Sequence, residues 1–419
     1  MSNVADRSDA KPSGFVPAEA VQQGFGEYIG NWLRRVRAGD LGSLPIIIGL
    51  FVIAIIFGTL EPVFFRERNF VNLLLQMSGI TAIAIGIVFV LLIAEIDLSV
   101  AFVSGVGGVT MTLLLREEVT NWPWPFAIGA ALLATTSIGL IHGLIITKAG
   151  VPSFVVTLAG LLAWSGVVLI LTTQYSNAGT IVIQDDVVLG IANRFLPQTW
   201  GWILFVLIVG GYTVSQLSQQ QSLRRQSLAT KPSSIVALQI LGLAVIAGGA
   251  VWYANRDRGV PVVAVIILCL LVGWSFIATR TRFGRYVYAI GGNPEAARRA
   301  GISVDNIRIA VFMISGFMSG VGGIILASRL RSVDTNTGSG NLLLNAIAAA
   351  VIGGTSLFGG SGRVMSAFLG ALIIAGVENG MGLLGLPSGV KFVVTGGVLL
   401  AAVLIDAFSR RSRASSGIA

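Results

Sequence analysis

Side chains that could perform covalent or metal chemistry are scarce in this sequence of 419 residues. It has one histidine, His142, and one cysteine, Cys269, so neither a His/Cys metal site nor a disulfide within the chain can be built. None of the lysines stands in the Gly-Lys-Ser/Thr context of a phosphate-binding loop. We therefore expect no catalytic residue, no metal and no cofactor, and ATP hydrolysis could occur only on another polypeptide.

Three acidic residues lie in or between apolar runs. Burying an ionised carboxylate in hydrocarbon costs free energy, so acids at such positions face a cavity, a partner or the interface. Glu95 and Asp97 stand where two apolar runs meet, and Asp97 is placed to cap the helix that opens at Leu98-Ser99. Either acid could instead line a transport pathway. Glu378, with Asn379 as its candidate partner, lies in a later apolar run, and its role stays open.

A glycine-rich break interrupts the apolar pattern between residues 353 and 363. Glycine costs about 1 kcal/mol per residue in a helix interior, so the five glycines here, four of them in two adjacent pairs, predict a tight turn or a kinked, re-entrant segment. Both arrangements place the segment against other backbone in the protein interior or at the inner surface. The paired glycines are Gly353, Gly354, Gly359 and Gly360.

Residues 280–307 form a polar segment that mixes cations with small and aromatic residues. Asn293 followed by Pro294 is a helix-start signal, and Gly301 is a stop signal. A short amphipathic helix is therefore expected. Such a helix could lie on the membrane surface or dock into a partner protein.

The composition predicts the elements that must position these residues. Hydrophobic residues make up 54% of the chain and charged residues 11%, whereas soluble domains carry about 25% charged residues. The mean hydropathy is +0.84. Because about 20 apolar residues cross the bilayer as a helix, the long apolar runs predict an all-α polytopic membrane protein with about 10–12 transmembrane helices. The expected spans are 44–60, 77–94, 98–115, 125–147, 151–173, 200–216, 234–254, 261–279, 308–328, 342–358, 364–383 and 389–406.

The positive charge has a membrane explanation rather than a nucleic-acid one. The net charge is +9, but the cations lie in short loops between apolar runs. With the N-terminus inside, about 19 of the 28 cations face the cytoplasm, as the positive-inside rule favours. We expect membrane lipid as a partner, no nucleic acid, and cytoplasmic tails at both ends. The expected divisions are a tail over 1–43, a membrane domain over 44–408 with a cytoplasmic loop at 217–233, and a tail over 409–419.

Four motifs in fixed order resemble the permease subunits of bacterial sugar ABC importers, the family of ribose, galactose and xylose permeases. The resemblance covers about residues 44–408. An insertion near 217–260, and Glu95 in front of the first motif, are most similar to the xylose-type branch. The motifs are IDLSV at 96–100, GLIITKAGVPSFVVTLAGLLAWSGV at 143–167, RFGRYVYAIGGNPEAARRAGI at 282–302 and LNAIAAAVIGGTSLFGGSGRV at 344–364.

This resemblance implies the ABC importer permease fold and the import of a monosaccharide, xylose or another pentose, across the inner membrane by alternating access. The implied partners are cytoplasmic ABC ATPase subunits, a periplasmic sugar-binding protein and a second copy of the chain. The family's coupling helix, which docks into the ATPase, maps here onto Gly291, Gly292, Asn293, Glu295, Ala296, Ala297 and Gly301.

The residues alone leave another transport mechanism open. An ion-coupled secondary transporter would use acids within the membrane that change protonation or bind a cation. Glu95, Asp97 and Glu378 are the candidates for that role. A membrane-embedded enzyme is disfavoured, because no pairing of a nucleophile with a base and no set of metal ligands is recognisable.

Overall fold

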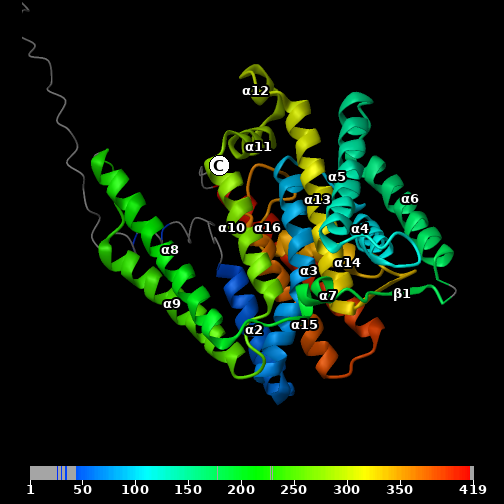
Figure 1. Cartoon of the computed structure of the whole chain (residues 1–419). Helices are drawn as coiled ribbons and strands as arrows, with labels where there is room; N and C mark the ends of the chain where they lie inside the picture. Colours follow the sequence, from blue (N-terminus) through cyan, green and yellow to red (C-terminus); the bar gives the residue numbers. More distant parts are fainter. Residues whose placement is uncertain are drawn as a thin grey trace, which may run out of the picture. The chain divides into compact units, whose positions relative to one another are not determined.

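The computed structural model describes residues 44–415 apart from 177, 227 and 229, together with Gly26, Gly30 and Arg34. Eight of the described helices are long and apolar enough to cross a membrane. They are α3 (Glu67–Leu92), α5 (Trp124–Lys148), α6 (Ser153–Gln174), α8 (Gln198–Arg225), α9 (Ser233–Asn255), α10 (Val262–Arg280), α13 (Val304–Leu330) and α15 (Met365–Leu383) (Figure 1).

Four shorter apolar segments complete the expected set. They are α2 (Leu44–Leu60), α4 (Val100–Leu115), α14 (Leu342–Ile352) and the first part of α16 (Ser388–Ser415). Each of the twelve predicted spans overlaps one of these twelve helices, so the all-α polytopic class is confirmed. The predicted tail over 1–43 lies outside the described residues except at three positions.

Short elements connect the long helices. They are η1 (Pro62–Phe65), α7 (Asp186–Asn193), α11 (Arg282–Gly292), α12 (Pro294–Arg299) and the strands β1 (Thr180–Val182) and β2 (Ser332–Asp334). The two strands pair antiparallel, with Ile181 opposite Val333. Because β1 follows α6 and β2 follows α13, this pairing links the segment just after α6 to the segment just after α13.

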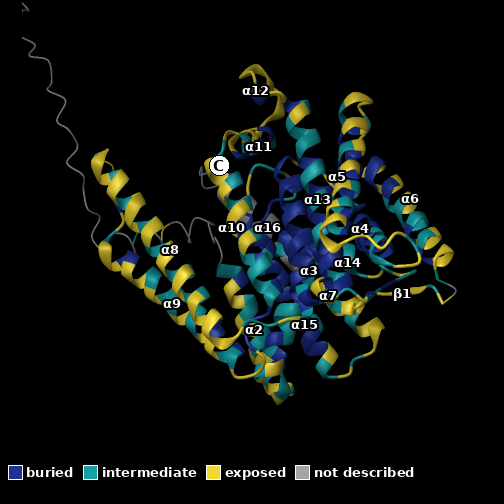
Figure 2. Ribbon diagram, viewed as in Figure 1, coloured by how far each residue is buried: buried dark blue, intermediate teal, exposed yellow. Residues whose placement is uncertain are grey.

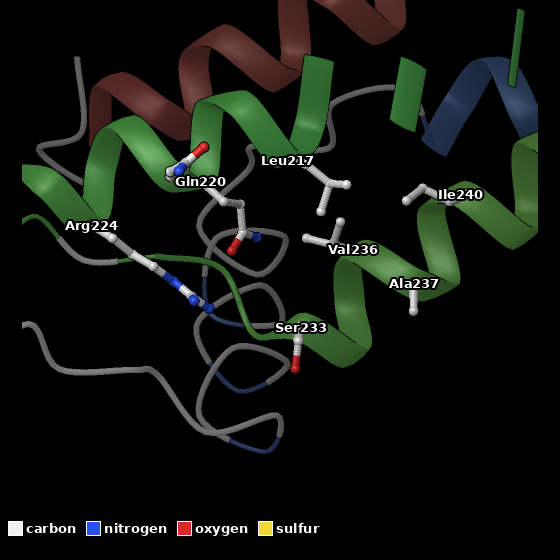
Figure 3. A pocket seen from close by; sticks show the side chains of 8 residues that line it. Leu217, Gln220, Arg224, Ser233, Val236, Ala237 and Ile240 are labelled. Atoms are coloured by element: carbon white, nitrogen blue, oxygen red, sulfur yellow. The ribbon is translucent and has the colours of Figure 1, made fainter. Parts of the chain in front are cut away.

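The chain divides into two compact units, of which the smaller holds residues 202–249 together with 1–37. The described part of the smaller unit consists mainly of the helix pair α8–α9. Helix α8 continues to Arg225, so residues 217–225 of the expected loop are helical. Near the joined ends of the pair lies a pocket of about 480 Å³ (Figure 3). Its lining contains none of the predicted site residues and consists of Leu217, Gln220, Gln221, Arg224, Ser233, Val236, Ala237 and Ile240.

The larger unit is built around α3 and α13, which have buried apolar and small residues along most of their length (Figure 2). In the most apolar stretch of α3 78% of the residues are buried, against 22% in α6, so α3 is a central helix and α6 a peripheral one. Glycines allow close backbone approach here. A Cβ on Gly139 of α5 would overlap the Phe312 carbonyl oxygen of α13, and one on Gly323 would overlap the Ser104 carbonyl oxygen of α4.

Two of the short helices are too short to cross the hydrocarbon alone. At 1.5 Å per residue, the 16 residues of α4 and the 11 residues of α14 reach about 24 and 16 Å, against about 30 Å of hydrocarbon. The predicted span over 342–358 is therefore wrong in extent. Helix α14 ends at Ile352 because the glycine-rich segment begins there, and Gly354 has a φ of +97° that favours glycine.

Candidate functional site

The short helix α12 forms where its signals predict. The Asn293 side-chain oxygen accepts a hydrogen bond from the Ala296 N–H at 2.9 Å, Pro294 occupies the first turn, and Gly301 follows the helix with a φ of +82°. Of its six residues only Ala297 is buried. Figure 1 shows α12 at the end of its unit, beyond α11. The helix therefore presents an exposed surface on a fixed base.

The base of α12 is a backbone-to-backbone junction at Gly291, the next-to-last residue of α11. A Cβ on Gly291 would overlap the Leu92 carbonyl oxygen at the end of α3 and lie 2.5 Å from the Gly360 nitrogen. Gly360 N–H donates to that same Leu92 oxygen at 2.9 Å. Three segments that are distant in sequence thus meet at one point, and only a residue without a side chain fits at Gly291.

The glycine-rich break supplies the third side of this junction. Gly359 and Gly360 have φ values of +85° and +69°, and the site of a Gly359 Cβ lies 2.9 Å from the Ala94 Cβ. The Tyr288 hydroxyl of α11 donates to the Gly362 carbonyl oxygen at 2.9 Å. Burial raises the pKa of Tyr288, although the nearby Arg363 opposes this, so the hydroxyl remains a donor at neutral pH.

The first half of the glycine-rich break, at Gly353, lies against the start of α15 rather than at the Gly291 junction. Gly353 packs against the backbone of Ser366, and a Cβ there would overlap the Ser366 carbonyl oxygen. Gly353 therefore packs the end of α14 against the start of α15. The glycine-rich break lies against other backbone in two places, at Gly353 and at Gly359–Gly360.

Glu95 lies immediately after the junction, in the non-helical link of residues 93–99 between α3 and α4. Its Oε1 is 2.9 Å from Nε of Arg308, in the second turn of α13. Both side chains are mostly buried, at 16% and 26% exposure. The preceding residue, Ala94, has a φ of +61°, a conformation that costs about 1–3 kcal/mol for a residue other than glycine. The link is therefore held in a strained turn by the junction on one side and an ion pair on the other.

Asp97 lies further along the same link and is buried. Its Oδ1 accepts from the Ser99 hydroxyl at 2.6 Å and the Ser99 N–H at 3.0 Å, and its Oδ2 accepts from the Ser315 hydroxyl at 2.7 Å. The predicted capping role is thus met in altered form. Asp97 binds the N-cap residue Ser99 rather than the first-turn amides of α4.

The link runs beside the first half of α13. Glu95 faces Arg308 and Asp97 faces Ser315, seven residues later on α13, which is about 10 Å along the helix. Helix α4 then packs along the second half, where Gly108 faces Gly323. Non-helical backbone at membrane depth is tolerated when protein covers it. The span is therefore completed by an irregular link and the shortened helix α4.

Glu378 has a different partner from the one expected. Its Oε1 accepts from the Asn345 amide of α14 at 2.6 Å. Asn379 instead forms a reciprocal amide pair with Asn69 of α3, with distances of 2.8 and 3.0 Å. The expected pairing of Glu378 with Asn379 is wrong, because adjacent residues point to different faces of α15.

The sequence did not predict three features of the site, namely Arg308, Ser315 and the Asn69–Asn379 pair. A buried Asp97 requires donors, which signals that some hydroxyl or cation must face it, but not which one. Within the described residues, no group of three or more His, Cys, Asp or Glu side chains could hold a metal ion.

Comparison with known proteins decides the family. Residues 69–403 match the family described as the permease component of branched-chain amino acid transport systems. The chain belongs to this permease family. It is thus a multi-pass membrane component of a transport system, and the family is one of transport permeases rather than enzymes.

Individual relatives cover most of this permease. It is 40% identical over 358 residues to the xylose transport system permease protein of Escherichia coli K12, which covers 84% of this chain and 88% of the relative. The xylose permease protein of Haemophilus influenzae Rd is 36% identical, with 88% and 98% covered. The ribose import permease protein of Escherichia coli K12 is 32% identical, with 86% and 92% covered. No solved structure gives a significant match.

Proposed function

We propose that this permease is the membrane-spanning subunit of an ATP-driven importer for xylose or another pentose. The relatives are named for xylose and ribose transport, and both sugars have five carbons. The likeness extends over most of both chains, so the whole membrane domain is compared rather than one motif. Sugar would cross by alternating access without covalent change.

The exposed helix α12 on its backbone junction is the observation that carries this proposal. A short, exposed helix suits insertion into a groove of a partner. Gly291 ties α11 rigidly to the end of α3, so a displacement of α12 would reach the central helix directly. We infer that α12 docks into an ABC ATPase subunit and transmits its closure to the membrane helices.

The remaining partners follow from the same proposal. A second copy of the chain would complete the central path, and a periplasmic sugar-binding protein would deliver the sugar. Both termini and α12 would lie in the cytoplasm, which the excess of cations on that side supports. Membrane lipid would cover the apolar outer surface.

The ion-coupled alternative loses its support. The family and the relatives are permeases of transport systems with several components. The three acids considered for that role also have partners within the chain: Glu95 with Arg308, Asp97 with Ser99 and Ser315, and Glu378 with Asn345.

Reconstitution tests the function directly. The permease is placed in vesicles with its ATPase and sugar-binding protein, and uptake of labelled xylose is followed with ATP held constant. We expect uptake that requires all three proteins and persists when an uncoupler dissipates the ion gradient. Uptake by the permease alone, or loss of uptake with the uncoupler, would contradict the proposal.

Labelling tests the orientation. In a Cys269→Ser background, Glu295→Cys places a thiol on α12 and Glu118→Cys places one in the exposed turn after α4. A membrane-impermeant maleimide should label the first only in inverted vesicles and the second in intact spheroplasts. The reverse pattern would overturn the orientation.

A further inference from the structure

The hydrogen bonds of Asp97 continue outward, through α5, to the peripheral helix α6. Ser99 Oγ, which donates to Asp97, also lies 3.4 Å from Nδ1 of His142 on α5. On the other side of that ring, Trp164 Nε1 of α6 donates to His142 Nε2 at 3.2 Å. A polar chain thus leads from Ser315 on the central helix α13, through Asp97, to an indole on α6.

One arrangement of protons satisfies every hydrogen bond between Trp164 and Asp97. An indole N–H can only donate, so His142 Nε2 accepts and the ring proton of a neutral imidazole lies on Nδ1. This Nδ1–H then faces the Ser99 oxygen, whose own proton goes to the Asp97 carboxylate. The direction of every hydrogen bond follows from its two ends, so the hydrogen-bond chain orients the N–H of the Trp164 ring toward His142.

The three groups behind the indole are all more buried than the indole itself. Trp164 is half-buried, whereas His142 has 4% exposure, Ser99 has none and Asp97 has 7%. Close packing holds the middle of the chain, since the site of a Gly160 Cβ lies 2.6 Å from His142 Nε2. The buried groups are therefore a rigid support, and the indole is the part that can meet another molecule.

Trp164 does not lie where tryptophans of membrane proteins usually gather. Interfacial tryptophans gather where helices leave the membrane. Five tryptophans here follow that rule, since they lie at or near helix ends: Trp122, Trp124, Trp200, Trp202 and Trp252. Trp164 is instead the twelfth of the 22 residues of α6, near the middle of the span. Trp274 is likewise the thirteenth of the 19 residues of α10, but its ring packs on Phe89 of α3.

We propose that Trp164 is a stacking platform for the sugar in the translocation path, and that His142 is the residue that positions it. The inference rests on the proposed function. A monosaccharide has an apolar face of C–H groups that can pack on an indole, as apolar ligand surfaces pack on aromatic side chains. Transport sites also lie near the bilayer midplane beside interrupted helices, and Trp164 shares its polar chain with the link before the shortened helix α4.

Direct observation of the indole tests the proposal. The complete importer is labelled with 5-fluorotryptophan, and the fluorine resonance of Trp164 is assigned by its loss in Trp164→Phe. Added xylose should shift this resonance and leave that of Trp124 unchanged. The absence of any shift at saturating xylose, in a preparation that imports xylose with ATP, would overturn the inference while the proposed function stands. A preparation that imports no pentose would overturn both.

Uptake by matched variants gives the second readout. Trp164→Leu should lower uptake roughly tenfold, Trp164→Phe, whose ring is still apolar but is no longer positioned, should lower it by a smaller factor, and Trp124→Leu should leave it unchanged. His142→Ala should lower uptake in the wild-type background but add little in Trp164→Phe, which has no N–H to position. His142→Gln, with one acceptor and one donor, should restore uptake. Equal, additive losses in both backgrounds would show that His142 only packs the helices and would contradict the positioning role.

Discussion

Arg308 Nε lies 2.9 Å from Glu95 Oε1, and this pair connects the start of α13 to the strained turn that ends α3. The two helices are the central ones of the larger unit. Because α12 leads into α13, and α11 just before it rests on the end of α3, the ion pair lies across the route by which a movement of α12 would enter the membrane domain. Glu95 is therefore interpreted as a structural partner in coupling rather than a proton carrier.

Neutralising one member of this pair should weaken coupling more than folding. Glu95→Gln removes the negative charge from a mostly buried ion pair and leaves the Arg308 cation without its opposite charge, which is destabilising. We expect the variant to insert and assemble, while sugar imported per ATP hydrolysed falls. The measurement is parallel uptake and ATPase activity in vesicles.

The charge swap provides the control. Glu95→Arg alone places two cations together, and combining it with Arg308→Glu restores an opposite pair. Partial recovery of coupling in the double variant is expected. Equal coupling in the wild type and in Glu95→Arg would show that the pair has no part in transmission.

The cap of α12 should set how well that helix docks. Asn293→Ala removes the side-chain acceptor for the Ala296 N–H, a loss of about 1 kcal/mol for the helix start. We expect weaker association with the ATPase, measured by titration in detergent, and near-normal thermal stability of the permease. Asn293→Asp retains an acceptor and should bind like the wild type, and unchanged binding by Asn293→Ala would argue against docking through α12.

The amide pair between α3 and α15 should matter for stability. Asn379→Ala leaves the buried Asn69 amide without its reciprocal partner, so a loss of about 1–2 kcal/mol in unfolding free energy is expected. Thermal unfolding in detergent measures it. Replacing both residues by leucine should cost less than the single change, and a double variant as unstable as the sum of the singles would show that the amides do not interact.

The order of the helices and the start and stop of α12 could be predicted, because both depend on local signals: apolar runs, Asn293-Pro294 and Gly301. The role of the glycine-rich break could be predicted only in part. Glycine indicates close approach without naming what approaches, and Leu92 proved to be the neighbour of Gly360. The partner of Asp97, Ser315, is 218 residues away in sequence, and a single serine among many carries no signal.

The neighbours Gly291 and Gly292 test the central claim most directly, since one is enclosed by backbone and the other has nothing within 4 Å of its Cβ position. Gly291→Ala and Gly292→Ala are compared in the complete importer by the sugar imported per ATP hydrolysed. The account predicts a loss of at least about tenfold for Gly291→Ala, or 1.4 kcal/mol, with ATP hydrolysis retained and Gly292→Ala close to the wild type. Equal and normal coupling in both variants would contradict transmission of force through this junction.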